Sequence, residues 1–236
     1  MKKYKAVLFD LDGTLLPMDN DEFSKAYFTE LAGAMVKYGY EPQKLVESIW
    51  KCVKQMVLND GAKTNEKVFW EKLCEIYNCS EEIERPKFDA FYKKEFDNTK
   101  RVCAFSDYSG KIIKTLKAKN IKVVIATNPM FPKIAIEKRI KWAGIEPNDV
   151  VYITTYENSH YCKPNPKYYT EIVNNLALEP GQCLMVGNDV EEDMVAKTAG
   201  LDVFLLTDYI INRKNNDISG FSQGNLEKLY EIIEKM

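Results

Sequence analysis

The chain has 236 residues, of which 45% are hydrophobic and 29% charged, with a net charge of −2. This composition is typical of a globular protein with one large domain, or one domain that carries an insert. The absence of a basic cluster argues against nucleic acid or an anionic membrane surface as a partner, and no apolar run is long enough to span a bilayer. Six scattered cysteines without a CxxC pair predict reduced thiols and a cytoplasmic location.

Residues 4–9 (YKAVLF) predict a buried strand at the start of the chain. Residues 20–100 show helical periodicity with four successive apolar faces, which predicts a small helical bundle. The aromatic residues of these faces are interpreted as the core of the bundle rather than as a substrate site. Hinges are expected at residues 15–20 and 97–106.

From residue 107 onward, apolar strands alternate with amphipathic helices. The expected strands are 121–126, 150–154, 183–186 and 203–206, and the expected helices include 132–142, 166–178, 190–199 and a C-terminal helix. This alternation predicts an α/β fold with a Rossmann-like parallel sheet and helices on both faces. The predicted core consists of 1–16 and 104–236, and the predicted helical insert is 17–103.

Polar side chains follow several of the predicted strands. They are Asp10 and Asp12 after the first strand, Thr127 and Asn128 after the second, and Asp189 and Asp193 after residues 183–186, with Lys163 in the segment CKPNP. Because parallel α/β sheets place their sites at the carboxyl ends of the strands, we expect these groups to converge on one edge.

The chemistry of these groups is complementary. Asp10 and Asp189 are tolerable side by side if a hard cation lies between them, and oxygen ligands with incomplete protein coordination favour Mg²⁺. A hydroxyl from Thr127, a backbone N–H from Asn128 and the charge of Lys163 together suit a phosphate dianion.

The order DLDGT, then Thr-Asn after a strand, then Lys-Pro, then GNDVEED resembles the haloacid dehalogenase-like superfamily. Within it, the chain is similar to the phosphatases that carry a helical cap inserted after the first motif. The resemblance covers nearly the whole chain, and it implies a cap domain at 17–103.

The resemblance also implies roles. Asp10 is expected to be the nucleophile that forms an aspartyl phosphate, and Asp12 the general acid and base. Mg²⁺ is expected to bind the Asp10 carboxylate, the Asp12 backbone carbonyl and Asp189. Thr127 and Lys163 are expected to bind the phosphoryl oxygens.

One motif departs from the pattern of the family. Many members have Gly-Asp where this chain has Gly187 and Asn188, followed by Asp189. We favour Asp189 as the metal ligand because the site needs its negative charge. Asn188 as a neutral ligand and Asp193 as a supporting group both stay open.

The predicted function is a Mg²⁺-dependent phosphatase that acts on a small phosphorylated metabolite, as a monomer or dimer. A phosphosugar mutase of the same superfamily is an alternative, as is a phospho-accepting switch protein. A dehalogenase is disfavoured by Asp12, because that chemistry has no leaving alkoxide to protonate. His160, Cys162 and Arg101 are interpreted as loop, packing and solvated residues.

Overall fold

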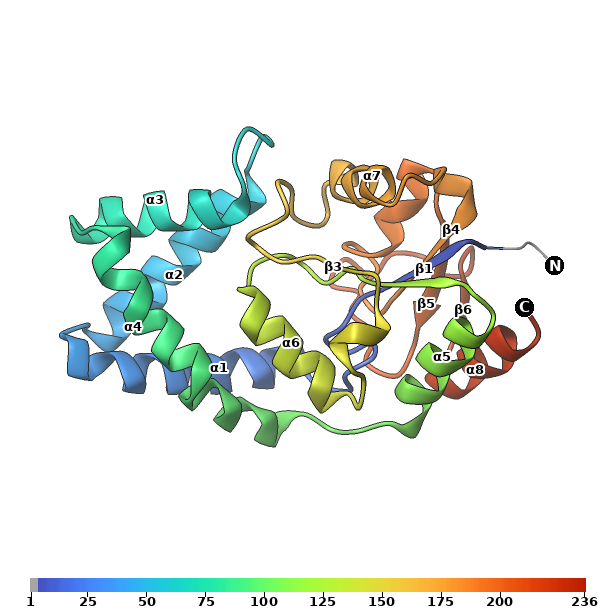
Figure 1. The fold of residues 1–236 in the computed structure, drawn as a ribbon, viewed down its shortest axis with the longest axis horizontal. Helices are drawn as coiled ribbons and strands as arrows, with labels where there is room; N and C mark the ends of the chain where they lie inside the picture. The colour runs from blue at the N-terminus through green and yellow to red at the C-terminus, as the bar shows by residue number, and fades with distance from the viewer. Residues whose placement is uncertain (1–3) are drawn as a thin grey trace.

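The computed structural model describes residues 4–236, and its core is a six-stranded parallel sheet in the order β3-β2-β1-β4-β5-β6 (Figure 1). All five strand pairs are parallel. The strands are β1 (Ala6–Phe9), β2 (Lys122–Ile125), β3 (Tyr152–Ile153), β4 (Cys183–Gly187), β5 (Asp202–Leu206) and β6 (Ser222–Gly224). This sheet confirms the predicted α/β class and its parallel topology.

Helices cover both faces of the sheet, as predicted. They are α5 (Asp107–Ala118), α6 (Lys133–Trp142), α7 (Pro166–Asn175) and α8 (Leu226–Glu234), with the short 3₁₀ helices η3 (Pro147–Asp149), η4 (Pro180–Gln182) and η5 (Met194–Ala199). Val7 and Phe9 of β1 face the core formed with α5, α6 and α8, whereas Ala6 and Leu8 face α7 and η5. All four side chains are completely buried, which explains the unbroken apolar run of this central strand.

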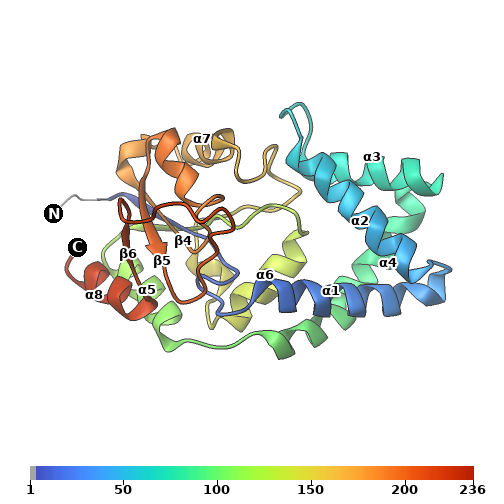
Figure 2. The same cartoon turned by 180° about the vertical axis from the view of Figure 1, so that it is seen from behind.

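Four helices lie between β1 and β2 and form a lobe at one end of the molecule (Figures 1 and 2). They are α1 (Asn20–Met35), α2 (Pro42–Val57), α3 (Asn65–Tyr77) and α4 (Glu81–Lys93), with the 3₁₀ helices η1 (Val36–Tyr38) and η2 (Glu95–Val102). The side chains of Asp19, Glu41 and Thr64 accept backbone N–H groups at the starts of α1, α2 and α3. These caps explain where the helices begin.

The predicted helix at 190–199 is wrong in its first half. Residues 190–193 form a turn, and only Met194–Ala199 wind into a 3₁₀ helix. Asp189 Oδ1 accepts the N–H groups of Glu191 and Glu192, both at 2.9 Å. This side chain therefore competes with regular helix at the start of the segment.

Two strands also differ from expectation. β3 covers two residues rather than 150–154, although Val151 and Thr154 continue its backbone bonds to β2. β6 was not predicted, because its sequence Ser-Gln-Gly has no apolar pattern. The helix predicted to reach residue 178 ends at Asn175.

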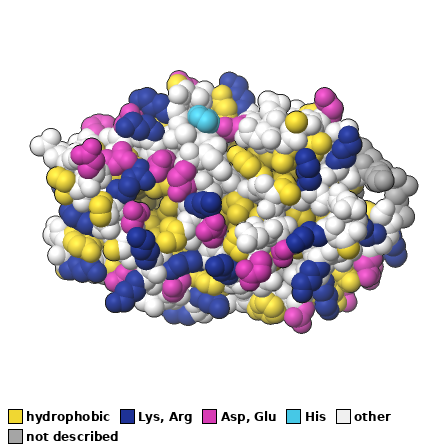
Figure 3. Space-filling view, in the orientation of Figure 1, with side chains coloured by type: hydrophobic (Ala, Val, Ile, Leu, Met, Phe, Trp, Pro, Cys, Tyr) yellow, Lys and Arg dark blue, Asp and Glu magenta, His cyan; other side chains and the backbone are white. Residues whose placement is uncertain are grey.

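Within the described residues, no helix is both long and apolar enough to cross a membrane. All six cysteines lie in this part of the chain and are free. Lysine, arginine and acidic side chains are interspersed over the face shown in Figure 3, and apolar side chains gather near its middle.

Candidate active site

The carboxyl ends of β1, β2 and β4 surround a cavity of about 100 Å³, which we call the acidic cavity. Its walls include the predicted site residues Asp10, Asp12, Thr127, Asn128 and Asp189. The cavity has the volume of about three water molecules in the liquid, so it has room for a small polar group rather than for a whole metabolite.

Lys163 approaches Asp10 from the segment before α7. Its ammonium group donates to Asp10 Oδ1 at 2.7 Å and to Asp193 Oδ1 at 2.6 Å, and the side chain is only 1% exposed. Burial alone would lower the pKa of Lys163, but the two carboxylates raise it well above the ordinary value. Lys163 is therefore a fixed positive charge beside Asp10.

Asp193 positions two parts of the site at once. One carboxylate oxygen binds Lys163, and the other accepts the backbone N–H of Asp189 at 3.0 Å. A Cβ on Gly187 would lie 2.0 Å from Asp193 Oδ2, so only glycine leaves room for this carboxylate. Asp193 thus helps to position Lys163 and the backbone of Asp189.

Asp12 forms an ion pair with Arg139 of α6. The arginine is completely buried, and its guanidinium lies 4.5 Å from the centre of the Phe131 ring. Although 18% of the Asp12 side chain is exposed, burial raises the pKa of its carboxyl group to about 6. Its Oδ1 atom is buried and accepts no hydrogen bond from the described residues. One of the two oxygens of this carboxylate therefore has no hydrogen-bond partner within the described part of the chain.

Asn188 has a structural role in this geometry. Its Oδ1 accepts from the hydroxyl of Thr14 at 3.0 Å, and its Nδ2 donates to the backbone oxygen of Tyr209 at 2.6 Å. A Cβ on Gly13 would come within 2.4 Å of Asn188 Nδ2. Asn188 therefore holds the loop that carries Asp12, which accounts for both polar atoms of its amide.

The donor atoms around the acidic cavity suit a hard divalent cation. Asp10 and Asp189 both line it, and carboxylate oxygens are the ligands that Mg²⁺ prefers. Across residues 4–236, no three histidine, cysteine or acidic side chains form a complete metal cluster. A cation here would therefore rely on two carboxylates together with backbone oxygen and water, as Mg²⁺ commonly does.

Two further residues contact the predicted site. Arg213 donates to Asp189 Oδ2 at 3.0 Å, and its side chain is 62% exposed. Glu192 accepts from Asn128 Nδ2 at 3.0 Å, and burial raises its pKa to about 7.

Arg139, Arg213 and Glu192 were missed by the sequence reasoning. A signal existed for Arg139, because it shares the buried face of α6 with Ala135, Ile136 and Ile140. A charged residue on an apolar helix face needs a buried partner. Nothing comparable in the sequence distinguished Arg213 or Glu192 from solvated charges.

Three side chains were interpreted from the sequence as having no catalytic role, and their contacts in the structure agree with that interpretation. His160 Nδ1 contacts Glu171 Oε1 at 2.6 Å, Cys162 is buried, and Arg101 pairs with Glu30. None of the three lines the acidic cavity.

A parallel α/β sheet with paired aspartates and a buried lysine at the carboxyl ends of its strands places the protein among the Rossmann-like folds whose ligand sites lie at this edge of the sheet. Residues 4–200 match the family model of the haloacid dehalogenase-like hydrolases, and the chain belongs to this family. The resemblance and the prediction of a hydrolytic enzyme are thereby confirmed.

Individual relatives agree with this assignment. A curated protein of Clostridium perfringens, PpaX, named as a candidate pyrophosphatase, is 28% identical over 199 residues, which cover 83% of this chain and 80% of that protein. The structure of a predicted phosphoglycolate phosphatase from Haemophilus somnus is 18% identical, with a TM-score of 0.60 and coverage of 98% and 99%. The magnesium-bound hydrolase YfnB of Bacillus subtilis is also 18% identical, with a TM-score of 0.58 and the same coverage of 98% and 99%. The two structural matches show the fold.

Proposed function

We propose that the protein is a Mg²⁺-dependent phosphatase that hydrolyses a small phosphorylated metabolite through an aspartyl phosphate. The observation that carries this proposal is the arrangement of Asp10 and Asp12. One carboxylate is held by the buried ammonium of Lys163, and the other lies in the same cavity with a free buried oxygen. Relatives described as a pyrophosphatase and as a phosphoglycolate phosphatase support hydrolysis of a phosphate compound.

In the first step, a carboxylate oxygen of Asp10 attacks phosphorus and forms an O–P bond while the ester P–O bond breaks. Asp12 gives its proton to the departing alkoxide, and the raised pKa of this carboxyl makes the protonated form that the step needs more populated than in an ordinary aspartate. Thr127, Asn128 and Lys163 bind the phosphoryl oxygens and hold phosphorus in line with Asp10.

In the second step, water attacks the phosphorus atom of the aspartyl phosphate. Asp12 takes the proton from this water, and the bond between phosphorus and Asp10 breaks to release inorganic phosphate. The net reaction consumes one water and yields an alcohol and phosphate, so both aspartates return to their starting states.

Mg²⁺ would be held by the carboxylates of Asp10 and Asp189 and by the backbone carbonyl of Asp12. When bound, it supplies the positive charge that offsets repulsion between these carboxylates and the phosphate dianion. The magnesium-bound relative supports this part of the proposal.

We treat 1–16 and 104–236 as the catalytic core and 17–103 as the cap. The two connections between these parts run side by side, because Ala104 N donates to the backbone oxygen of Pro17 at 2.8 Å. A cytoplasmic location and a monomer or dimer are part of the same proposal.

The alternatives fit the site less well. A phosphosugar mutase needs cationic groups for a second phosphate beside the first. Arg213 is the one cation among the described residues that line the larger neighbouring pocket, and it pairs with Asp189. A dehalogenase has no use for the acid Asp12.

The test is release of inorganic phosphate from a panel of phosphate monoesters by the purified protein, with Asp10→Asn as the paired variant. Phosphate release with Mg²⁺ that disappears in Asp10→Asn supports the proposal. Equal release by both proteins would reject Asp10 as the nucleophile.

A further inference from the structure

A second and larger cavity lies between the helical lobe and the sheet, and we call it the aromatic pocket. Its volume is about 340 Å³, which is within the range of small-molecule sites. It adjoins the acidic cavity, because the two share the wall residues Asp12, Asn20, Asn128, Met130, Phe131 and Glu192. A substrate with its phosphate in the acidic cavity therefore extends its leaving group into the aromatic pocket.

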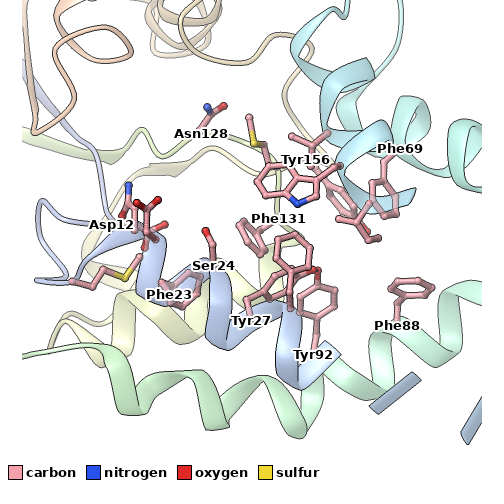
Figure 4. A pocket seen from close by; sticks show the side chains of 18 of the residues that line it. Asp12, Phe23, Ser24, Tyr27, Phe69, Phe88, Tyr92, Asn128, Phe131 and Tyr156 are labelled. Carbon is pink, nitrogen blue, oxygen red and sulfur yellow. The ribbon is translucent and has the colours of Figure 1, made fainter. Parts of the chain in front are cut away.

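Aromatic side chains dominate the walls of this pocket. Ten of its 22 lining residues are aromatic, and they come from α1, α2, α3, α4 and the loops after β2 and β3. Figure 4 shows Tyr27, Tyr92 and Phe131 close together, with Asp12 at one side, and the ring centres of Tyr27 and Phe131 lie 5.1 Å apart. The sequence interpretation of these aromatics as bundle core alone is therefore incomplete, because one part of their surface lines a cavity.

Part of the wall is left uncovered by the protein itself. Trp50 of α2 is 52% exposed, and its ring lies 5.2 Å from the ring of Phe28 at an angle of 43°. Exposed aromatic surface inside a concave pocket is typical of a ligand site. Flat rings of this kind bind another planar ring by stacking or by edge-to-face contact.

The charges of the pocket disfavour an anionic leaving group. Four acidic residues line it: Asp12, which is paired with Arg139, and Asp21, Asp89 and Glu192. The only cation among the described lining residues is Arg213, which is already paired with Asp189. A carboxylate or second phosphate placed here would lose its water without finding an unpaired cation among these lining residues.

We propose that the preferred substrates are phosphate monoesters whose leaving alcohol carries a planar aromatic or heteroaromatic ring without negative charge. This inference rests on the proposed phosphatase function and names its substrate class. It differs from what the names of the relatives indicate, because pyrophosphate and phosphoglycolate both have small anionic leaving groups. The ester oxygen lies beside Asp12, and the ring lies among Tyr27, Trp50 and Phe131.

The test compares three esters with similar primary alkoxide leaving groups, so that leaving-group basicity does not decide the result. They are 2-phenylethyl phosphate, propyl phosphate and 2-(4-carboxyphenyl)ethyl phosphate. We expect kcat/KM for 2-phenylethyl phosphate, called the phenyl ester below, to exceed that for propyl phosphate, the propyl ester, by about tenfold to a hundredfold. The carboxylated ester should fall back to the level of the propyl ester or below, and a kcat/KM equal to or above that of the phenyl ester would overturn the inference.

A variant of the pocket wall separates ring recognition from the phosphate chemistry. Trp50→Ala should reduce the phenyl-to-propyl ratio of kcat/KM about threefold to tenfold. Phe105→Ala is the matched control, because Phe105 is 62% exposed and does not line the pocket. An unchanged ratio in Trp50→Ala, or an equal drop in both variants, would reject the aromatic pocket as the determinant.

Calorimetric titration of Asp10→Asn distinguishes failure of this inference from failure of the proposed function. Tighter binding of 2-phenylethyl phosphate than of propyl phosphate, without phosphate release by the wild type, would reject phosphatase activity and retain the pocket. Phosphate release without any preference for the phenyl ester in either assay would retain the activity and reject the substrate class.

Discussion

Arg139 of α6 donates to the carboxylate of Asp12, although the two residues are 127 positions apart in the chain. The arginine is completely buried, and its guanidinium lies against the rings of Phe131 and Phe23. This packing fixes the guanidinium, so Asp12 has a rigid cationic partner at the junction of the acidic cavity and the aromatic pocket. Arg139 is a positioning residue for Asp12.

Replacing Arg139 should damage both stability and turnover. Arg139→Met leaves Asp12 buried without its partner, and breaking a buried ion pair costs about 3–5 kcal/mol. We also expect kcat to fall about tenfold to a hundredfold because the acid loses its orientation. Denaturant unfolding and phosphate release measure the two effects.

Arg139→Lys is the control, because it keeps the charge but loses the planar fork. It should recover part of the stability and less of the turnover. If Arg139→Met keeps kcat for every ester while it unfolds more easily, the pair has only a structural role.

The Arg139–Asp12 pair also illustrates how far the sequence could be interpreted. Asp12 was identified because short motifs after strands are local features, and the parallel sheet then brings them together. The ion pair depends on how α6 is rotated against the sheet, which no motif specifies. The sequence therefore predicted five of the six strands and a group of candidate site residues that line one cavity, but not this partner.

The fold was predictable where the hydrophobic pattern was strong, as in the apolar runs of β1 and β2 and the helical periodicity of α8. It was not predictable where a single side chain controlled the backbone. The turn at 190–193 depends on Asp189 accepting two backbone N–H groups, and the periodicity there still resembles a helix. The aromatic pocket was missed for a different reason, because aromatic residues in a core and aromatic residues that line a pocket have the same spacing in the sequence.

Acid should weaken the helical lobe through Glu84. Burial alone would raise the pKa of Glu84, but hydrogen bonds from Lys87 and Tyr40 bring it below the ordinary value. A carboxyl whose pKa is lowered by folding stabilises the fold above its unfolded pKa, about 4.3 for glutamate, and loses that contribution as the pH falls further.

Glu84→Gln should therefore lower the free energy of unfolding by about 1 kcal/mol at neutral pH. The difference from wild type should shrink progressively as the pH falls below about 4.3, because Glu84 then begins to take up a proton. Urea unfolding at neutral pH and over a series of acidic pH values measures this effect, and a difference that does not change with pH would contradict the role of the charged form.

Removing the exposed cation beside Asp189 should make Mg²⁺ bind more tightly. Arg213 donates to Asp189 Oδ2, so its charge competes with a cation for the same carboxylate. In Arg213→Ala, we expect the Mg²⁺ dissociation constant to fall about twofold to fivefold, since an exposed ion pair contributes at most about 1 kcal/mol.

Calorimetric titration with Mg²⁺ measures that constant without relying on turnover. Lys214→Ala is the matched control for loss of one nearby charge, because only the backbone N–H of Lys214 contacts Glu191. Chelation should abolish turnover in all three proteins, and added Mg²⁺ should restore it. Weaker Mg²⁺ binding in Arg213→Ala would indicate that Arg213 supports the metal site instead.

The last prediction separates the role of Asp12 from that of Asp10. A general acid is needed for a basic alkoxide and much less for a nitrophenolate, and such catalysis contributes about a hundredfold to ten-thousandfold. Asp12→Asn should therefore slow formation of the phosphoenzyme strongly with 2-phenylethyl phosphate and weakly with nitrophenyl phosphate. The variant also lacks the base for the second step, so rapid-quench kinetics should show a burst of nitrophenol followed by slow turnover. Asp10→Asn should show no burst with either ester, and equal losses for both esters without a burst in Asp12→Asn would remove Asp12 as the acid and base.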